Sequence, residues 1–193
     1  MKRETTTGII LAGGKSSRMG QDKGLLMLNG RTFMSHIIEA LEPVVSDIII
    51  VSNNSDYDIY KLKRVADILK DSGPLAGLYT GLFHSETENN IVLSCDVPLI
   101  NTAVLNILIE GFETEKDVIH IKSEEKNMPL IAIYKKQCMP HFLKRLHDGE
   151  RRLQTAIDNM NTKSIPLEPA MQRFVKNINT ASDLKEITNG SNN

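Results

Sequence analysis

The stretch "GIILAGGKSSRMGQDK" (residues 8–23) decides the fold, because a short apolar run in it ends directly in a glycine-rich turn. Its first six residues, "GIILAG", have the length and composition of a strand that is buried on both faces of a sheet. Two similar runs follow, "DIIIVS" (47–52) and "NIVLSC" (90–95). Between the first two lies "RTFMSHIIEALEPV", whose apolar residues recur at the spacing of one helix face. Strands that alternate with helices in this way predict a parallel sheet.

The second half of the chain continues the alternation less regularly. Two segments have helical spacing, namely "TAVLNILIEGF" (102–112) and "CMPHFLKRLHDG" (138–149). Three others have the pattern of strands, namely "DVIHI" (117–121), "PLIAIY" (129–134) and "RFVKNI" (173–178). We therefore expect a three-layer α/β/α fold with a mostly parallel sheet. Ligands of such open sheets bind beyond the carboxyl ends of the strands.

The length and composition are those of one globular domain. The chain has 193 residues, of which 40% are hydrophobic and 24% are charged, and no Pro-, Gly- or Ser-rich linker divides it. We expect a single domain over residues 1–185 and a disordered polar tail over residues 186–193. The formal net charge of −1 excludes the basic field that non-specific nucleic-acid binding requires.

The sequence favours a cytoplasmic protein. No apolar run approaches the roughly 20 residues that a membrane-spanning helix needs. The opening residues "MKRETTT" are polar and lack the apolar core of a signal peptide. The two cysteines, Cys95 and Cys138, are too few for a disulfide framework, so we interpret them as reduced thiols.

The glycine-rich turn is not a P-loop, although Gly14, Lys15 and Ser16 look like the end of one. The P-loop pattern is G-x-x-x-x-G-K-[ST]. Gly8 and Gly13 have the required spacing, but Gly14 stands where Lys is needed. Counting from Gly8 to Gly14 instead makes the loop one residue too long. The dinucleotide pattern G-x-G-x-x-G also fails.

The composition of the turn nevertheless suits a phosphate group. Gly13 and Gly14 allow backbone amides to approach a ligand closely, because no Cβ is in the way. Ser16 adds a hydroxyl group, and Arg18 and Lys23 add positive charges that phosphate oxygens can meet. An ordinary strand-to-helix turn that carries surface cations is the alternative, which spacing alone leaves open.

Asp96 is the best candidate for a metal ligand. It ends the third apolar run in "SCDVP", so its carboxylate is expected at the carboxyl edge of the sheet, facing the first turn. Mg²⁺ prefers one or two carboxylates together with phosphate oxygens and water. A turn-capping Asp before Pro98 is the alternative interpretation. We interpret Cys95 as a small buried residue and not as a nucleophile.

The stretch "LAGGKSSRMGQDK" (11–23) resembles the signature L-A-G-G-x-S-x-R-M-G-x-D-K of the molybdenum cofactor guanylyltransferase (MobA) family. Further segments are similar to later family motifs, namely "DSGPLAGLYTGL" (71–82), "SCDVPLI" (94–100), "GERR" (149–152) and "NINT" (177–180). The resemblance extends over residues 8–185. It is closer to the guanylyl branch than to the cytidylyl branch, whose first loop typically reads L-A-A-G.

The resemblance implies a Rossmann-like nucleotidyltransferase fold and a defined reaction. GMP would pass from GTP to the terminal phosphate of molybdopterin carrying molybdenum, with Mg²⁺ as cofactor and pyrophosphate as the leaving group. It also implies transient contacts with proteins that deliver the pterin and receive the product. Cytidylyl transfer and transfer to a sugar phosphate are the nearest alternatives. A non-catalytic nucleotide-binding adaptor is a more distant one.

The resemblance also implies roles for individual residues. Lys23 would contact the α-phosphate region, Arg18 the departing phosphates and Asp96 the metal, which makes these three the expected catalytic set. The other nucleotide contacts would come from the first turn and from two later loops, namely Leu11, Ala12, Gly13, Gly14, Ser16, Asn53, Asp71, Gly73 and Pro74. We expect Lys15 to be less important than Arg18 or Lys23.

Two of these expectations concern recognition of the substrates. Asp71 is the expected guanine reader, because a carboxylate can accept from both N1–H and N2–H of guanine; a loop Asp that starts a turn before Gly73 is the alternative. The late motifs would contact the pterin through four residues, Arg151, Arg152, Asn177 and Asn179. Surface arginines at a helix start and an ordinary strand end are the respective alternatives.

Overall fold

Strand β1 (Thr6–Leu11) is an interior strand of the sheet, and all six of its residues are buried. It pairs in parallel with β4 (Asp47–Val51) on one side and with β6 (Asn89–Ser94) on the other. Ile9, for example, lies between Ile49 and Val92. The three apolar runs therefore form neighbouring strands, and their carboxyl ends meet at one edge of the sheet.

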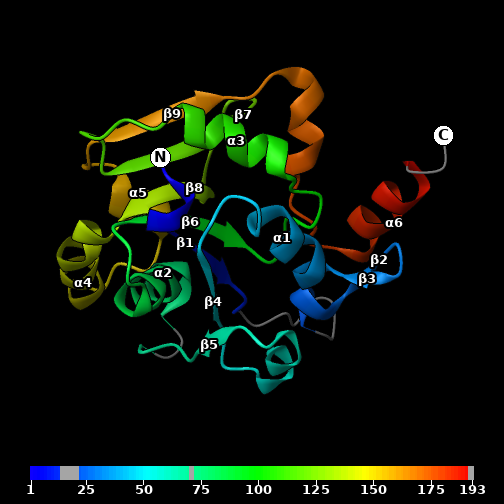
Figure 1. The fold of residues 1–193 in the computed structure, drawn as a ribbon, viewed down its shortest axis with the longest axis horizontal. Coiled ribbons are helices and arrows are strands. Elements are labelled where there is room, and N and C mark those ends of the chain that lie inside the picture. Colours follow the sequence, from blue (N-terminus) through cyan, green and yellow to red (C-terminus); the bar gives the residue numbers. More distant parts are fainter. Residues whose placement is uncertain (14–21, 70–71, 191–193) are drawn as a thin grey trace.

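The computed structural model describes residues 1–13, 22–69 and 72–190, and its main sheet has seven strands in the order β5-β4-β1-β6-β8-β7-β9 (Figure 1). The remaining strands of this sheet are β5 (Lys63–Val65), β7 (Val118–Ser123), β8 (Lys126–Lys135) and β9 (Thr162–Pro166). Strand β8 pairs antiparallel with both β6 and β7, whereas the other four pairings are parallel. The prediction of a mostly parallel sheet is confirmed.

Helices cover both faces of the sheet, which confirms the three predicted layers (Figure 1). On one face lie α1 (Phe33–Leu41) and α3 (Thr102–Glu110). On the other lie α2 (Gly73–His84), α4 (Met139–His147) and α5 (Leu153–Ile157). The alternation along β1 matches this arrangement, because Ile10 belongs to the first core and Ile9 to the second. None of the helices described is long and apolar enough to cross a membrane.

Local sequence signals explain where these helices begin. The Thr32 hydroxyl accepts from the Ser35 amide at 3.1 Å and thereby caps α1, and the Asn101 side chain caps α3 in the same way. Helix α2 begins at Gly73, whose φ of +72° is accessible to glycine, and Pro74 follows in the first turn. The stretch 71–82, taken from the sequence as a loop motif, is thus mostly helical.

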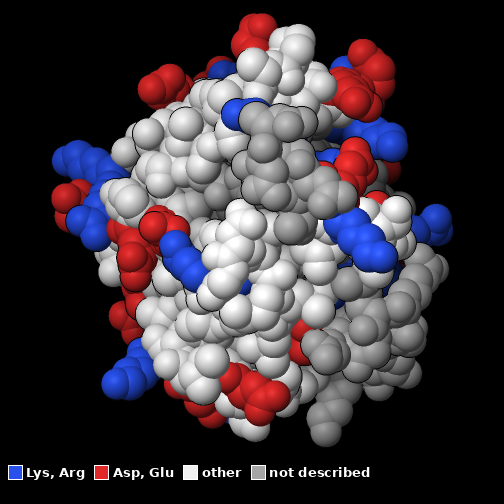
Figure 2. All heavy atoms as spheres, turned by 90° about the vertical axis from the view of Figure 1, so that its right-hand side faces the viewer, with Lys and Arg blue, Asp and Glu red and all other residues white. Residues whose placement is uncertain are grey.

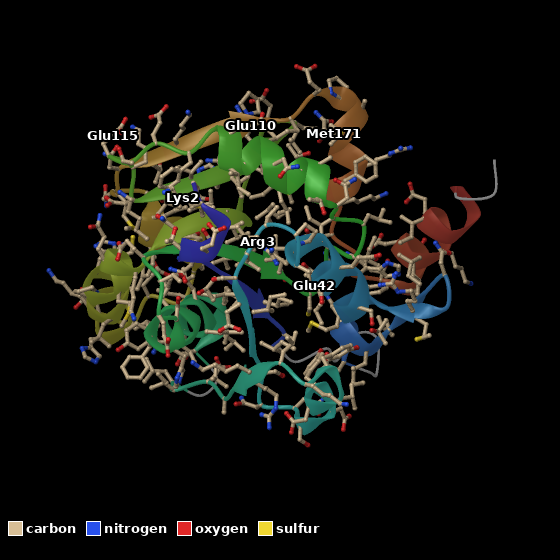
Figure 3. All side chains as sticks on the ribbon, in the orientation of Figure 1. Lys2, Arg3, Glu42, Glu110, Glu115 and Met171 are labelled. Carbon is tan, nitrogen blue, oxygen red and sulfur yellow. The ribbon has the colours of Figure 1, made fainter. Side chains whose placement is uncertain are left out.

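The N-terminal segment is fixed to the end of α1. Arg3 lies beside Glu42 (Figure 3), where its guanidinium donates to the backbone carbonyls of Glu42 and Val45, both at 3.0 Å. These carbonyls follow the last turn of α1, where backbone acceptors lack partners within the helix. The contact therefore joins the start of β1 to the helix that packs on it.

A small hairpin and the C-terminal helix form a separate contact at one end of the molecule. The hairpin pairs β2 (Met27–Leu28) with β3 (Arg31–Thr32) through an Asn-Gly turn in which both residues have positive φ. Helix α6 (Ala181–Gly190) lies next to it (Figure 1). Leu184 and Ile187 of α6 pack against a small core formed by Leu28, Phe33 and Ile178.

Two boundary predictions are wrong. Residues 173–178 are not a strand, because the 3₁₀ segment η5 (Pro169–Val175) continues into them and the last strand is β9. Strand β9 lies at the sheet edge, so its alternation of polar residues is a weak signal in the sequence. Residues 186–190 are helical and belong to α6, whose apolar contacts outweigh the polar composition of the tail.

Candidate functional site

A cavity of about 380 Å³ opens at the carboxyl ends of β1 and β4, beside the start of α2. Its walls come from several segments of the chain: Leu11, Ala12, Gly13 and Asp22; Val51, Ser52, Asn53, Asn54 and Asp67; Ser72, Gly73, Pro74 and Gly77; and Ser94 and Leu130. The expected nucleotide contacts Leu11, Ala12, Gly13, Asn53, Gly73 and Pro74 are thus brought together. The place agrees with the rule for ligands of open α/β sheets.

Part of the backbone at this edge is already used by the sheet. The Ala12 amide donates to the Val51 carbonyl at 3.0 Å, and the Leu11 carbonyl accepts from the Cys95 amide at 3.0 Å. These two groups are therefore committed to strand pairing. The expected contributions of Leu11 and Ala12 to a ligand are restricted to their remaining surface, and backbone donors begin at Gly13.

Several predicted residues fall outside the described part of the chain. Gly14, Ser16 and Arg18 of the first turn belong to this group, as do Lys15 and the expected guanine reader Asp71. Their predicted roles stay predictions that rest on the sequence.

Asp67 is a cavity residue that the sequence analysis missed. Its Oδ1 is buried and has no hydrogen-bond partner among the described residues, and burial raises the pKa of the carboxyl. Its amide donates to the Asn53 side chain at 3.1 Å. A Cβ built on Gly13 or on Gly77 would come within ordinary contact distance of the carboxylate, at 3.6 and 3.7 Å. Asp67 thus lines the cavity beside the two glycines, and its carboxylate holds a buried acceptor that no described residue satisfies.

Lys23 and Asp96 face each other, as the sequence predicts. Lys23 begins the 3₁₀ turn η2 (Lys23–Leu25), and Asp96 follows the end of β6. The distance from Lys23 Nζ to Asp96 Oδ2 is 4.0 Å, and both side chains are mostly buried. Asp96 Oδ1 is buried without a hydrogen-bond partner in the described structure. The carboxylate therefore keeps free coordination capacity toward a ligand.

Asp22 holds the turn that presents Lys23, a role that was not assigned to it from the sequence although it is a fixed position of the family signature. Its Oδ1 accepts from the Gly24 amide at 3.1 Å and from the Tyr57 hydroxyl, and its Oδ2 accepts from Asn54 at 3.3 Å. The Tyr57 side chain is fully buried, and burial together with this hydrogen bond raises the pKa of its phenol. Gly24 is required there, because a Cβ would clash with the phenol oxygen. No local sequence pattern reveals this contact, because Tyr57 lies 35 residues further along the chain than Asp22.

Cys95 is not a nucleophile in this site. It is buried, and burial together with the nearby carboxylates of Asp96 and Asp22 raises the pKa of its thiol to about 12. Cys138 is also a free, buried cysteine, and burial raises its pKa to about 12 as well. Neither thiol is reactive at neutral pH, as expected from the sequence.

A second cavity, of about 700 Å³, adjoins the first and shares Ser94 and Leu130 with it. The expected pterin contacts Asn177 and Asn179 line this cavity. The other lining residues come from the β7–β8 hairpin, the end of β6 and η5: Val97, Ser123, Glu124, Lys126, Asn127, Met128, Pro129, Ile131, Gln172, Arg173, Val175 and Lys176. A chamber with three cationic side chains suits an anionic ligand that also carries hydrogen-bonding groups.

Arg151 and Arg152 are not brought together with these asparagines. The Arg151 guanidinium donates to the Leu146 and Glu150 carbonyls at 2.9 Å, and its own carbonyl lies against Gly73. The Arg152 side chain is 84% exposed and lies 3.8 Å from Glu150. Neither arginine is among the described residues that line the second cavity, so the prediction of a common pterin site for all four residues is not supported.

The charges around the site are local. In Figure 2, which faces the right-hand side of Figure 1, the visible Lys and Arg side chains are interspersed with Asp and Glu. This agrees with the formal net charge of −1. An anionic ligand would therefore be held by particular side chains of the site, of which Lys23 is one, and not by a basic surface.

The fold is an open α/β sheet with two adjoining cavities at its carboxyl edge, where proteins of this class bind their ligands. Comparison with known proteins identifies the family: residues 8–163 match the MobA-like NTP transferase domain, and the chain belongs to this family. It is 37% identical to a probable molybdenum cofactor guanylyltransferase of Flavobacterium johnsoniae over 95% of this chain and 97% of that protein. The resemblance found in the sequence is confirmed.

Two further similarities agree with this. A molybdenum cofactor guanylyltransferase of Vibrio parahaemolyticus is 32% identical over 94% of each chain. The crystal structure of molybdopterin-guanine dinucleotide biosynthesis protein A from Archaeoglobus fulgidus matches with a TM-score of 0.81 over 96% of this chain and 98% of that chain. Its sequence identity is 23%, so that match supports the fold alone.

Proposed function

We propose that the protein transfers GMP from GTP to the terminal phosphate of molybdopterin carrying molybdenum, forming a guanine dinucleotide and releasing pyrophosphate. The observation that carries this proposal is the apposition of Lys23 and Asp96 beside two adjoining cavities. The first cavity suits a nucleotide, and the second suits an anionic acceptor rich in hydrogen-bonding groups. The names of the two guanylyltransferase relatives described above support both substrates.

The reaction needs charge neutralisation more than acid–base chemistry. An oxygen of the acceptor phosphate forms a bond to the α-phosphorus of GTP, and the bond from that phosphorus to the bridging oxygen breaks. A phosphate monoester has a second pKa near 6, so it is already largely ionised at neutral pH and requires no general base. The barrier lies in bringing two anions together in line, which positioning and fixed positive charges lower.

Lys23 supplies a positive charge next to both cavities, because its sequence neighbour Asp22 lines the first and its hydrogen-bond partner Asn179 lines the second. Its ammonium lies near Asp96 and contacts Asn179, which lines the acceptor cavity. We assign it to the α-phosphate region, where charge develops in the transition state. On the strength of the family signature, Gly14, Ser16 and Arg18 are assigned to the phosphates that leave.

Asp96 fits the role of a magnesium ligand. Its buried Oδ1 lacks a hydrogen-bond partner in the described structure, and a carboxylate at this sheet edge is a ligand that Mg²⁺ prefers. Bound Mg²⁺ would neutralise phosphate charge and help to align the phosphates. Asp22 is less suited, because both of its oxygens are engaged by Tyr57, Gly24 and Asn54.

We assign recognition of guanine to Asp67 in preference to Asp71. Asp67 presents a carboxylate oxygen without a described partner in the nucleotide cavity. Such an acceptor matches the N1–H and N2–H donors of guanine, a pair that cytosine does not offer. Asn53 supports this arrangement, because it holds the Asp67 backbone.

The acceptor is assigned to the second cavity. Asn177 and Asn179 offer donors and acceptors to a pterin ring, and Lys126 and Arg173 offer charges to its phosphate. Arg151 and Arg152 are given no direct role in this assignment. The pterin would arrive from, and the product pass to, other proteins through transient contacts. Free buried cysteines agree with a reducing compartment, and we propose the cytoplasm.

The test is a transfer assay with molybdopterin carrying molybdenum, Mg²⁺ and either GTP or CTP. We expect GTP-dependent formation of the dinucleotide with one pyrophosphate released per product. A preference for CTP would make the protein a cytidylyltransferase, and transfer only to a sugar phosphate would identify a different acceptor. Nucleotide binding without any transfer would favour a non-catalytic adaptor, which the retained Lys23 and Asp96 argue against.

A further inference from the structure

The segment 177–180 passes directly over the Asp96 turn and is attached to it. The Ile178 amide donates to the Asp96 carbonyl at 2.8 Å, and the Ile178 side chain is fully buried. The two neighbours of Ile178 in the sequence, Asn177 and Asn179, line the acceptor cavity. The segment thus lies between the acceptor cavity and the residues that face the nucleotide.

Asn179 makes a direct contact with the central cation. Its Oδ1 accepts a hydrogen bond from Lys23 Nζ at 2.5 Å. The same ammonium lies 4.0 Å from Asp96 Oδ2, which is longer than the roughly 2.7–2.9 Å of a charge-assisted hydrogen bond. The ammonium is therefore hydrogen-bonded to the neutral amide and not to the carboxylate.

This preference is unusual for a lysine, because a carboxylate is the stronger acceptor. Both side chains are mostly shielded from solvent, with 21% of Lys23 and 16% of Asp96 exposed, so their attraction is only partly screened. Without Asn179, Lys23 would be drawn into a close ion pair with Asp96. Such a pair would occupy both groups and would have to be broken before phosphate oxygens could enter.

The backbone of Asn179 is itself fixed by the start of α6. The Asn179 and Thr180 amides both donate to Asp183 Oδ2 at 2.9 Å, and the Asp183 amide donates to the Thr180 hydroxyl at 3.1 Å. This reciprocal pattern is a helix-capping arrangement. Leu184 and Ile187 then anchor α6 on the small core beside the β2–β3 hairpin. The backbone from which the Asn179 side chain projects is thus fixed by the fold.

We infer that Asn179 is a positioning residue for Lys23, which it holds away from Asp96 so that both groups stay available to the nucleotide. The inference rests on the proposed function in that the ligand of Lys23 is taken to be a nucleoside triphosphate. It differs from the assignment of Asn179 as a pterin contact, because it gives the residue an effect on nucleotide binding in the absence of any pterin.

The test measures GTP binding in the presence of Mg²⁺ and the absence of an acceptor, by calorimetry. Asn179→Ala is expected to weaken GTP binding about tenfold, because the hydrogen bond to a charged group is lost and the ion pair closes. In a Lys23→Ala background the same substitution should cause no further loss. Unchanged GTP affinity in Asn179→Ala, or an equal loss in both backgrounds, would overturn the inference.

Asn177→Ala provides the matched comparison, because Asn177 lines the same cavity and no Lys23–Asn177 hydrogen bond occurs in the described structure. It should raise the KM for the acceptor and leave GTP affinity as in the wild type. An equal loss of GTP affinity in Asn177→Ala and Asn179→Ala would contradict a specific role for Asn179. Asp183→Ala, which lines neither cavity, should weaken GTP binding about threefold in the Lys23 protein and not in the Lys23→Ala protein.

The binding experiment also separates this inference from the proposed function. If the wild type binds GTP but does not transfer it to molybdopterin, the proposed acceptor is wrong while the comparison of variants still decides the role of Asn179. If the wild type binds CTP in place of GTP, the proposed nucleotide is wrong, and the same set of variants is compared with CTP. Thermal unfolding of each variant confirms that the fold is intact.

Discussion

Replacement of Asp67 by Asn should make the protein more stable and less specific at the same time. The carboxylate is partly buried in the nucleotide cavity, and one of its oxygens has no hydrogen-bond partner in the described structure. Burial disfavours the charged carboxylate, and a neutral Asn side chain avoids this desolvation cost, which partial exposure limits to about 1 kcal/mol. For a chain of this length, that amounts to a rise in Tm of roughly 2–4 °C at pH 7.

The pH dependence of stability provides a second test of whether Asp67→Asn is more stable than the wild type. Burial raises the pKa of Asp67 above its unfolded value of about 3.9, so folding favours the protonated carboxyl. As the pH rises from about 3.9 through the native pKa, the carboxyl ionises and the wild type becomes less stable relative to Asp67→Asn. The difference in Tm between the two proteins should be largest at neutral pH and should shrink as the pH is lowered toward 4.

Nucleotide binding should change in the opposite direction. The variant loses a charged acceptor for guanine, whose hydrogen bond contributes about 1.5–3 kcal/mol. Asn keeps one acceptor oxygen, so we expect the lower bound, about tenfold weaker GTP binding. Comparison with ITP, which lacks the 2-amino group, isolates the effect: the wild type should prefer GTP, and Asp67→Asn should lose that preference.

Asp71→Asn is the matched control, because Asp71 is the reader that the sequence suggests. If Asp67 reads the base, Asp71→Asn keeps the preference for GTP over ITP. A preference that survives in Asp67→Asn but disappears in Asp71→Asn would refute the structural assignment. A lower Tm for Asp67→Asn at pH 7 would refute the stability argument independently.

Three further predictions concern the phosphate site and its support. Lys23→Ala and Asp96→Ala should each abolish dinucleotide formation while circular dichroism shows a retained fold. Near-normal transfer by either variant would contradict its role. Lys15→Ala should reduce dinucleotide formation much less than Lys23→Ala. Tyr57→Phe should lose about 1.5–3 kcal/mol of stability with the hydrogen bond to Asp22, seen as a lower urea midpoint. At pH 8, Cys95 should resist a thiol reagent until the protein is unfolded, because burial raises its pKa to about 12, so rapid labelling of native protein would count against that burial.

The part of the fold that the sequence predicts is the part with strong local patterns. Strands β1, β4 and β6 are buried on both faces, so their sequences are continuous apolar runs that periodicity detects. Strand β9 lies at an edge and is partly exposed, so its polar sequence carries no such pattern. Residues 173–178 contain apolar side chains for a different reason, because Phe174 and Val175 pack on the core from a 3₁₀ segment.

The residues of the candidate site also fall into those that the sequence predicted and those that it did not. Asp96 was predictable from its place just after the buried strand β6, and Lys23 was singled out as a cation of the turn after β1 and a fixed position of the family signature. Asp67 was missed because it follows the short edge-side strand β5, whose sequence is charged and irregular. Asp22 and Asn179 act through partners that are 35 and 156 residues distant in the chain, and no local pattern encodes such contacts.

The antiparallel strand β8 allows the acceptor cavity to change independently of the nucleotide cavity. Because it runs against its neighbours, the β7–β8 turn at Glu124 and Glu125 lies at the carboxyl edge of the sheet and forms a wall of the acceptor cavity. The nucleotide cavity takes only Leu130 from this hairpin. Insertions, deletions or substitutions in the turn can therefore reshape the chamber for a new acceptor while the donor nucleotide stays the same.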